Sequence, residues 1–178
     1  MQLFHYSEEP GIQVFHPRAS KYHTYEVVWA VAEEGATNFL VPRDCPRVTY
    51  GVAEYTSQED RMRWMAQTAA ERVVAIESAW LDRMRRCVMY EYAMPNETFV
   101  MDDVHAAYYV SREAIRPTNC RRIDDLLGEL AKSRVEFRML PSLWPLRDEV
   151  AKSTLRFSIS RMRNAAAPVD GYEPKVPQ

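Results

Sequence analysis

The chain has 178 residues, of which 47% are hydrophobic and 27% charged, and its formal net charge is −2. These values predict a single globular domain over residues 1–167 with a Pro-rich tail over residues 168–178, and they argue against a general nucleic-acid binder. No apolar run approaches the length of a membrane span, and no secretory signal is visible. The three cysteines are widely spaced and match neither a disulfide framework nor a zinc site. We therefore expect a cytoplasmic protein without a membrane partner.

The first third of the chain contains several runs that favour extended structure. The segment Tyr25–Ala32 is nearly all apolar at its centre, as in a strand that is covered on both faces. Glu33–Leu40 is compatible with a short helix, and the prolines that follow exclude regular structure. The other predicted strands of this part are Leu3–Tyr6, Ile12–Phe15 and Val48–Glu54.

Helices are predicted mainly in the middle and at the end of the chain. Ser57 is a good N-cap, and neither Gly nor Pro follows before Arg86, which predicts a helical region with a break near Thr68. Its inward face would carry Val73, Ile76, Trp80 and Met84. Two more helices are expected, Arg121–Lys132 and one from Pro145 to about Ala166, the latter with an Arg-rich face that we interpret as solvated.

Between these helices, Val88–Ala93 and Ala106–Ser111 are rich in Tyr and Val and predict two strands that form a central hairpin. Val135–Leu140 alternates like a strand with one wet face. Strands and helices follow one another without a βαβ rhythm, and no G-x-G-x-x-G or Walker A motif is present. The expected fold is therefore α+β, a mixed, mainly antiparallel sheet of about six strands covered by several helices.

Few residues stand out for their chemistry. His5 lies in an apolar strand, His16 and His23 lie in polar segments, and no His pair has the spacing of a metal site, so we expect no metal. Cys45 lies between two arginines, which would favour a thiolate, but a small half-buried residue in a rigid Pro turn is the preferred interpretation.

Two stretches resemble ADP-ribosyltransferase-like domains. Residues 3–7, LFHYS, resemble the first core strand of such domains, which carries a His, and residues 108–117, YYVSREAIRP, resemble the late strand that delivers an acid. The resemblance implies NAD as cofactor: His5 would bind the ADP-ribose, Tyr25 or Trp29 would stack on the nicotinamide, and Glu113 would stabilise an oxocarbenium-like transition state. The chain departs from the family pattern in two ways: it has a Trp where the family usually has a Tyr, and its acid lies outside an E-x-E or Q-x-E context. These departures are compatible with a domain that has kept the fold and lost the activity.

The whole chain also resembles an uncharacterised bacterial family whose members open with LFH-[F/Y]-SE. That family carries PRDCPRV and S-x-x-RMRNA, which correspond here to Pro42–Val48 and Ser158–Ala165. The competing hypothesis is thus a non-catalytic binding or interaction domain, in which a small-molecule ligand is possible and the predicted site residues are structural. The oligomeric state is not indicated by the sequence. The two hypotheses differ in whether His5 and Glu113 converge on one cleft.

Overall fold

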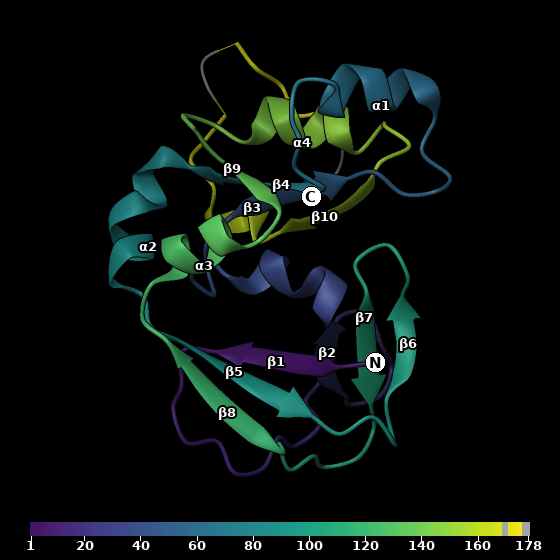
Figure 1. Ribbon diagram of the computed structural model, residues 1–178, viewed down its shortest axis with the longest axis vertical. Helices are drawn as coiled ribbons and strands as arrows, with labels where there is room; N and C mark the ends of the chain where they lie inside the picture. The colour runs from purple at the N-terminus through teal and green to yellow at the C-terminus, as the bar shows by residue number, and fades with distance from the viewer. Residues whose placement is uncertain (169–170, 176–178) are drawn as a thin grey trace.

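The computed structural model describes residues 1–168 and 171–175, which form two β-sheets stacked one above the other with helices between and above them (Figure 1). The predicted α+β class is confirmed. Short helices connect the strands: η1 Glu33–Phe39, α1 Gln58–Met65, η2 Ser78–Trp80, α2 Leu81–Arg86, α3 Leu126–Lys132, α4 Trp144–Val150 and η3 Met162–Asn164.

The lower sheet has six strands in the order β6-β7-β2-β1-β5-β8, all of them antiparallel to their neighbours. Its strands are β1 Leu3–Ser7, β2 Val28–Ala32, β5 Met89–Met94, β6 Val100–Asp103, β7 Tyr108–Ser111 and β8 Asn119–Ile123. The first strand of the chain is therefore a central strand of this sheet, which explains its apolar and aromatic composition.

The pairing between β1 and β2 is short. Only Leu3 and Phe4 pair with β2, whereas all five residues of β1 pair with β5. Beyond Phe4 the two strands diverge, and the imidazole Nδ1 of His5 donates a hydrogen bond to the carbonyl oxygen of Trp29 at 2.8 Å. A side chain thus satisfies a carbonyl group of β2 close to the end of the short β1–β2 ladder.

The upper sheet has four strands in the order β10-β3-β4-β9, with β4 and β9 parallel. Its strands are β3 Arg47–Gly51, β4 Arg72–Glu77, β9 Val135–Leu140 and β10 Arg156–Ser160. Val74 and Ile76 point to an apolar cluster between the two sheets that also contains residues of α2 and α3. Val73 and Ala75 point the other way, into a second cluster with residues of α1 and α4.

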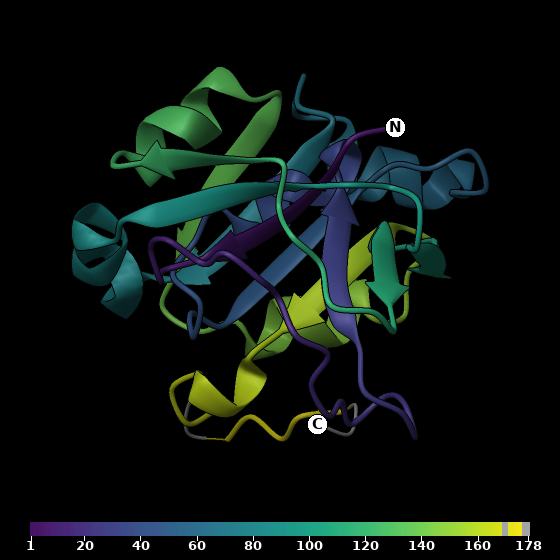
Figure 2. The same ribbon diagram turned by 90° about the horizontal axis from the view of Figure 1, so that it is seen from below.

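The lower face of the six-stranded sheet is covered by two connecting segments rather than by a helix. The segments that follow β1 and β7 cross this face (Figure 2) and pair with each other through the bridge between Phe15 and Ile115. Tyr92 fastens the first of them, because its hydroxyl donates to the carbonyl oxygen of Glu9 and accepts from the N–H of Ile12. The result is a third apolar cluster beneath the sheet.

The long helical region predicted between Ser57 and Arg86 is wrong in its second half. The cap is confirmed, since Ser57 Oγ accepts from the N–H of Asp60, but α1 ends at Met65 and Arg72–Glu77 is the buried strand β4. A short apolar run of β-branched residues fits a helix or a strand by periodicity alone. The pairing of β4 with β3 and β9 decides in favour of the strand.

Three further predictions are corrected in the same way. The last predicted helix ends at Val150, and Arg156–Ser160 is strand β10, so Lys152 and Arg156 share no helix face. The first residues of the expected helix Arg121–Lys132 belong to β8. The expected central hairpin is absent from the described pairings, because β7 pairs with β2 and with β6, a strand that the sequence did not predict.

The end of the chain contacts α4. The hydroxyl of Tyr172 donates to a carboxylate oxygen of Asp148 at 2.6 Å, and the N–H of Lys175 donates to the same oxygen. Part of the predicted tail is thus held against the upper helices, while residues 169–170 and 176–178 lie outside the described residues. Among the helices of the described ranges, none is long and apolar enough to cross a bilayer.

Candidate functional site

His5 lies beneath the sheet in an apolar environment. Its ring packs against Phe15, with the ring centroids 4.6 Å apart, and Phe15 in turn makes an edge contact with Tyr92. Burial lowers the pKa of the imidazole, so His5 is neutral at pH 7 and its Nδ1 proton is committed to the carbonyl oxygen of Trp29. In this arrangement His5 fixes the backbone of β2.

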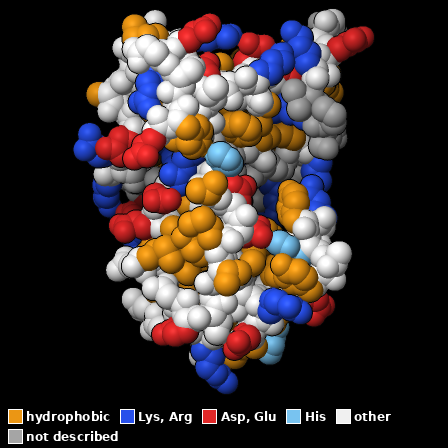
Figure 3. Space-filling view, turned by 90° about the vertical axis from the view of Figure 1, so that its right-hand side faces the viewer, with side chains coloured by type: hydrophobic (Ala, Val, Ile, Leu, Met, Phe, Trp, Pro, Cys, Tyr) orange, Lys and Arg blue, Asp and Glu red, His pale blue; other side chains and the backbone are white. Residues whose placement is uncertain are grey.

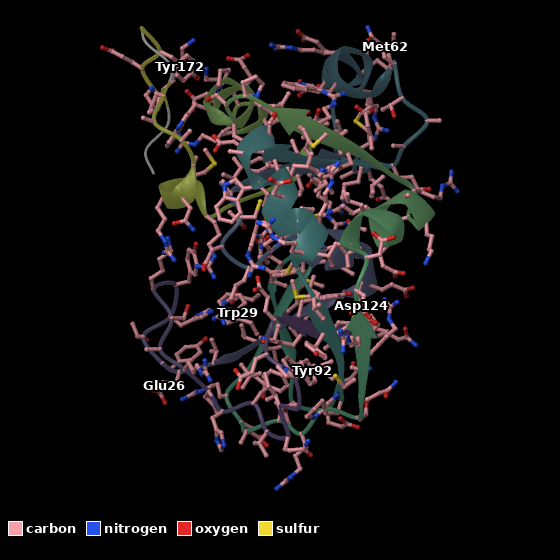
Figure 4. All side chains as sticks on the ribbon, turned by 90° about the vertical axis from the view of Figure 1, so that its left-hand side faces the viewer. Glu26, Trp29, Met62, Tyr92, Asp124 and Tyr172 are labelled. Atoms are coloured by element: carbon pink, nitrogen blue, oxygen red, sulfur yellow. The ribbon has the colours of Figure 1, made fainter. Side chains whose placement is uncertain are left out.

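The side chain of Trp29 lies on the opposite face of the same sheet. In Figure 4, Trp29 is on the side of the upper sheet, whereas Tyr92 is on the lower side. This follows from the alternation of side chains along β2, in which Val28 and Ala30 belong to the lower cluster. His5 therefore contacts Trp29 through the main chain, and their side chains face different spaces.

An aromatic group surrounds Trp29. His23 stacks on Tyr25, with centroids 5.0 Å apart and planes 24° apart, and it also lies 5.5 Å from the Trp29 ring. Tyr22 and Tyr108 make edge contacts with Trp29. The structure thus brings the two predicted ring contacts together. We call Tyr22, His23, Tyr25, Trp29 and Tyr108 the aromatic cluster.

The member that connects Tyr25 to Trp29, His23, was missed at the sequence level. We expected it to be exposed in a polar loop, but it is half-buried, and its Nε2 lies 3.2 Å from Asp102. The signal was present, because His23, Tyr25 and Trp29 are separated by two and four positions before and within a strand, which places them on one side of an extended chain.

Glu113 follows the end of β7 and is exposed. Its N–H donates to Ser111 Oγ, and its side chain lines an open pocket of about 560 Å³ together with His16, Glu97 and Arg116. Its neighbour Arg112 lies over the Tyr25 ring, 4.6 Å from the centroid. Glu113 thus follows a residue that contacts the aromatic cluster, while its own side chain lines a different surface.

The predicted site residues consequently lie in three places. Tyr25 and Trp29 lie together where β2 begins, with Arg112 from the end of β7 over Tyr25, since Val28 pairs with Ser111. The side chain of Glu113 lines a separate pocket that contains no member of the aromatic cluster. His5 lies apart from the pocket that Glu113 lines, under the ring of Phe15. The aromatic cluster and the guanidinium of Arg112, at one end of the sheet, can hold a flat ring and a negatively charged group of a small molecule.

Cys45 does not have the character of a nucleophile. It is fully buried, and burial raises the pKa of its thiol to about 12, although the nearby Arg47 acts in the opposite direction. Desolvation of the thiolate outweighs the cation, so the preferred interpretation of a small packed residue agrees with its environment. Across residues 1–168 and 171–175, no group of three or more His, Cys, Asp or Glu side chains could hold a metal ion.

Comparison with known proteins places the chain in a family. Residues 4–165 match the model of a family of unknown function, DUF6886, and because the match spans most of the chain, the protein belongs to this family. No curated protein and no solved structure matches the chain.

Proposed function

We propose that this member of the DUF6886 family binds NAD and acts as an ADP-ribosyltransferase-like enzyme in the cytoplasm. The family carries no assigned activity, so the proposal depends on one geometric observation. Tyr25 and Trp29 meet through His23, and the guanidinium over Tyr25 belongs to Arg112, the residue directly before Glu113. A surface for a flat ring and a guanidinium for a phosphate thus occur together, and the carboxylate that would act on the developing cation belongs to the next residue in the chain.

Each residue has a role that follows from its chemistry. Tyr25 and Trp29 present ring faces and edges to the nicotinamide, while Arg112 offers a planar fork that suits a phosphate oxygen pair. The carboxylate of Glu113 stabilises the positive charge that develops on the ribose when the bond to nicotinamide breaks. His5 is a positioning residue here, because its Nδ1 holds the carbonyl oxygen of Trp29.

A second candidate function is a binding domain without catalysis. Two observations favour it. His5 and Glu113 do not converge on one cleft, since His5 is not among the residues that line the pocket of Glu113. The ring of His5 is also covered by Phe15, and its one proton is already donated to the main chain. An imidazole in this state offers no donor to an ADP-ribose. On this alternative, the aromatic cluster binds a nucleotide-like ligand and Glu113 is an ordinary exposed carboxylate.

Calorimetry with NAD and an assay of nicotinamide release distinguish the two functions. For the enzyme, Trp29→Ala weakens NAD binding at least tenfold, whereas Glu113→Gln leaves the Kd within about threefold and slows nicotinamide release by ~10²-fold or more, the usual scale for losing an electrostatic contact in the transition state. Glu97→Gln is the matched control, since Glu97 lines the same pocket as Glu113. Binding without release supports the binding domain, and absence of NAD binding contradicts both NAD-based functions.

A further inference from the structure

The space between the two sheets contains buried arginines that form no ion pair within the described residues, although Glu34 and Asp44 act on Arg72 and Arg47 at longer range. Arg47 on β3 is only 6% exposed, and its guanidinium donates one hydrogen bond, to the carbonyl oxygen of Cys45, while it lies over the ring of Phe39. Arg72 on β4 donates to Asn38 Oδ1 at 3.0 Å. Within residues 1–168 and 171–175, neither forms an ion pair, and the side chain of Arg161 has no polar contact at all.

Arg47 and Arg72 lie at opposite ends of the β3–β4 ladder, and both reach the end of η1. Arg72 contacts Asn38, and Arg47 lies over Phe39, whose ring centroid is 5.7 Å from that of Tyr108. Burial lowers the pKa of both arginines, that of Arg72 to about 10, and the phenol of Tyr108 opposes the shift of both, as Glu34 does for Arg72. Arg161 follows Ser160, the residue that pairs with Arg47 across the sheet, and lies near enough to lower the pKa of Arg47 further. All three remain cations at neutral pH.

Hydroxyl and amide groups complete the surroundings. The hydroxyl of Tyr108, on the lower sheet, is 3.1 Å from Ser158 Oγ on β10, so this contact joins the two sheets at the same place. Asn38 is 1% exposed, and its Nδ2 has no hydrogen-bond partner, as is also true of the buried Thr37 Oγ1 beside it. A buried donor without a partner costs free energy, and native proteins retain few of them without a reason.

The backbone at Arg161 is unusual as well. Arg161 has a φ of 59°, in the left-handed region that residues other than glycine rarely adopt. This conformation ends β10 beside Arg47 and begins η3. The cost of placing an arginine there is of the order of 1–3 kcal/mol. Figure 3 shows the side of the molecule where the sheets meet as hollowed, with Lys and Arg side chains in and beside the hollow.

We infer that Arg47, Arg72 and Arg161, with Tyr108, Ser158 and Asn38, form a binding site for the phosphate groups of a phosphorylated small molecule. A phosphate anion supplies the negative charge and the acceptor oxygens that these donors lack, and arginines in a protected site are the residues best suited to receive it. The inference goes beyond the NAD proposal, because it depends on buried arginines that form no ion pair; the two sites share only Tyr108, whose ring belongs to the aromatic cluster and whose hydroxyl contacts Ser158.

The experiment is calorimetry of the full chain with pyrophosphate, at two salt concentrations. The wild type binds, and its affinity falls at higher salt. Arg161→Gln binds at least tenfold more weakly, whereas Arg163→Gln, an exposed arginine two residues away, stays within twofold. Equal effects of these two substitutions, or no binding by the wild type at millimolar pyrophosphate, overturn the inference.

Arg47→Met separates a binding role from a structural one. A structural arginine would lower the melting temperature when it is removed. An arginine kept for a ligand, once replaced by an apolar side chain of similar volume, loses pyrophosphate binding and leaves the melting temperature unchanged or higher. A lower melting temperature of Arg47→Met in phosphate-free buffer therefore contradicts the inference.

The two proposals can fail separately. If NAD fails to bind while pyrophosphate binds and depends on Arg161, the phosphate site stands and the dinucleotide proposal falls. If NAD binds equally well to the wild type, Arg47→Met and Arg161→Gln, and pyrophosphate does not bind, the NAD proposal stands and the phosphate site falls.

Discussion

The two faces of the six-stranded sheet differ in how completely their buried polar groups are paired. On the lower face, the hydroxyl of Tyr92 both donates and accepts, and the Nδ1 of His5 has its carbonyl partner. On the upper face, Asn38 Nδ2 and Thr37 Oγ1 have no partner, and Arg47 has no carboxylate in the described part of the chain. A face that only has to hold the fold together can satisfy every group, whereas a face that receives a ligand keeps donors in reserve.

This difference between the two faces bears on the site residues that were predicted from the sequence. His5 lies on the lower face, where its Nδ1 is hydrogen-bonded to the carbonyl oxygen of Trp29, while the residues of both proposed ligand sites lie on the other face and at the end of β7. The difference between the two faces would be disproved if substitutions on the lower face left the free energy of unfolding unchanged, or if substitutions on the upper face lowered it.

The largest expected effect is on the lower face. Phe15 is 8% exposed and contacts both His5 and Tyr92. We expect Phe15→Ala to reduce the free energy of unfolding by about 3–5 kcal/mol, because the cavity it leaves lies under segments that cannot collapse easily. Urea unfolding followed by Trp fluorescence measures it.

Tyr22→Ala is the control for this substitution. Tyr22 is 71% exposed and belongs to the aromatic cluster, so the same kind of truncation should change the free energy of unfolding by at most about 0.5 kcal/mol. Equal losses for the two variants would mean that the two faces do not differ in the way described.

A smaller effect is expected from pH, again on the lower face. Burial lowers the pKa of His5 below its usual 6.5, so in the window below pH 6.5 the unfolded chain binds a proton that the folded chain does not. The free energy of unfolding therefore falls as the pH is lowered through this window, by up to about 1.4 kcal/mol per pH unit.

His5→Asn tests this origin, because its amide can donate to the Trp29 carbonyl oxygen without titrating. The loss of stability between pH 7 and pH 5.5 should largely disappear in this variant. Asp148 and Glu129, whose pKa values are lowered in the fold, lose their contributions only at more acidic pH, below their ordinary values of 3.8 and 4.5. An unchanged pH dependence would assign the effect to other groups.

Much of the lower sheet could be predicted from the sequence, because its strands carry strong β-forming runs such as Tyr25–Ala32. In the upper sheet, the strands that correspond to β3 and β9 were predicted, but β4 and β10 were missed for a physical reason. Arg72–Glu77 has apolar residues at positions that suit a helix as well as a strand, and only its pairing with β3 and β9 resolves the ambiguity. Arg156–Ser160 alternates weakly, and it becomes a strand through its pairing with β3.

The candidate site residues could likewise be predicted only in part, because some of them meet only through tertiary contacts. The resemblance named Tyr25 or Trp29 as alternatives for one role, and the structure shows that the two residues lie close together through His23. Arg47 and Arg161 could not be connected, because they are more than a hundred residues apart and meet only when β10 pairs with β3. Whether an arginine forms an ion pair depends on its tertiary contacts, so a local sequence pattern does not indicate it.

The smallest predicted effect concerns the upper face, and it tests whether the buried arginines there lack negative charge. Asn38→Asp keeps the shape of the side chain and adds a negative charge beside Arg72, whose Nη1 already contacts Asn38 Oδ1. Because a charge-assisted hydrogen bond replaces a neutral acceptor and no donor is left without a partner, we expect the free energy of unfolding to rise by about 1 kcal/mol, together with weaker pyrophosphate binding. Asn119→Asp, an exposed change of the same charge on β8, should alter neither quantity by more than about 0.5 kcal/mol. A destabilised Asn38→Asp would show that the upper face is not short of negative charge, and the contrast between the faces would then rest on packing alone.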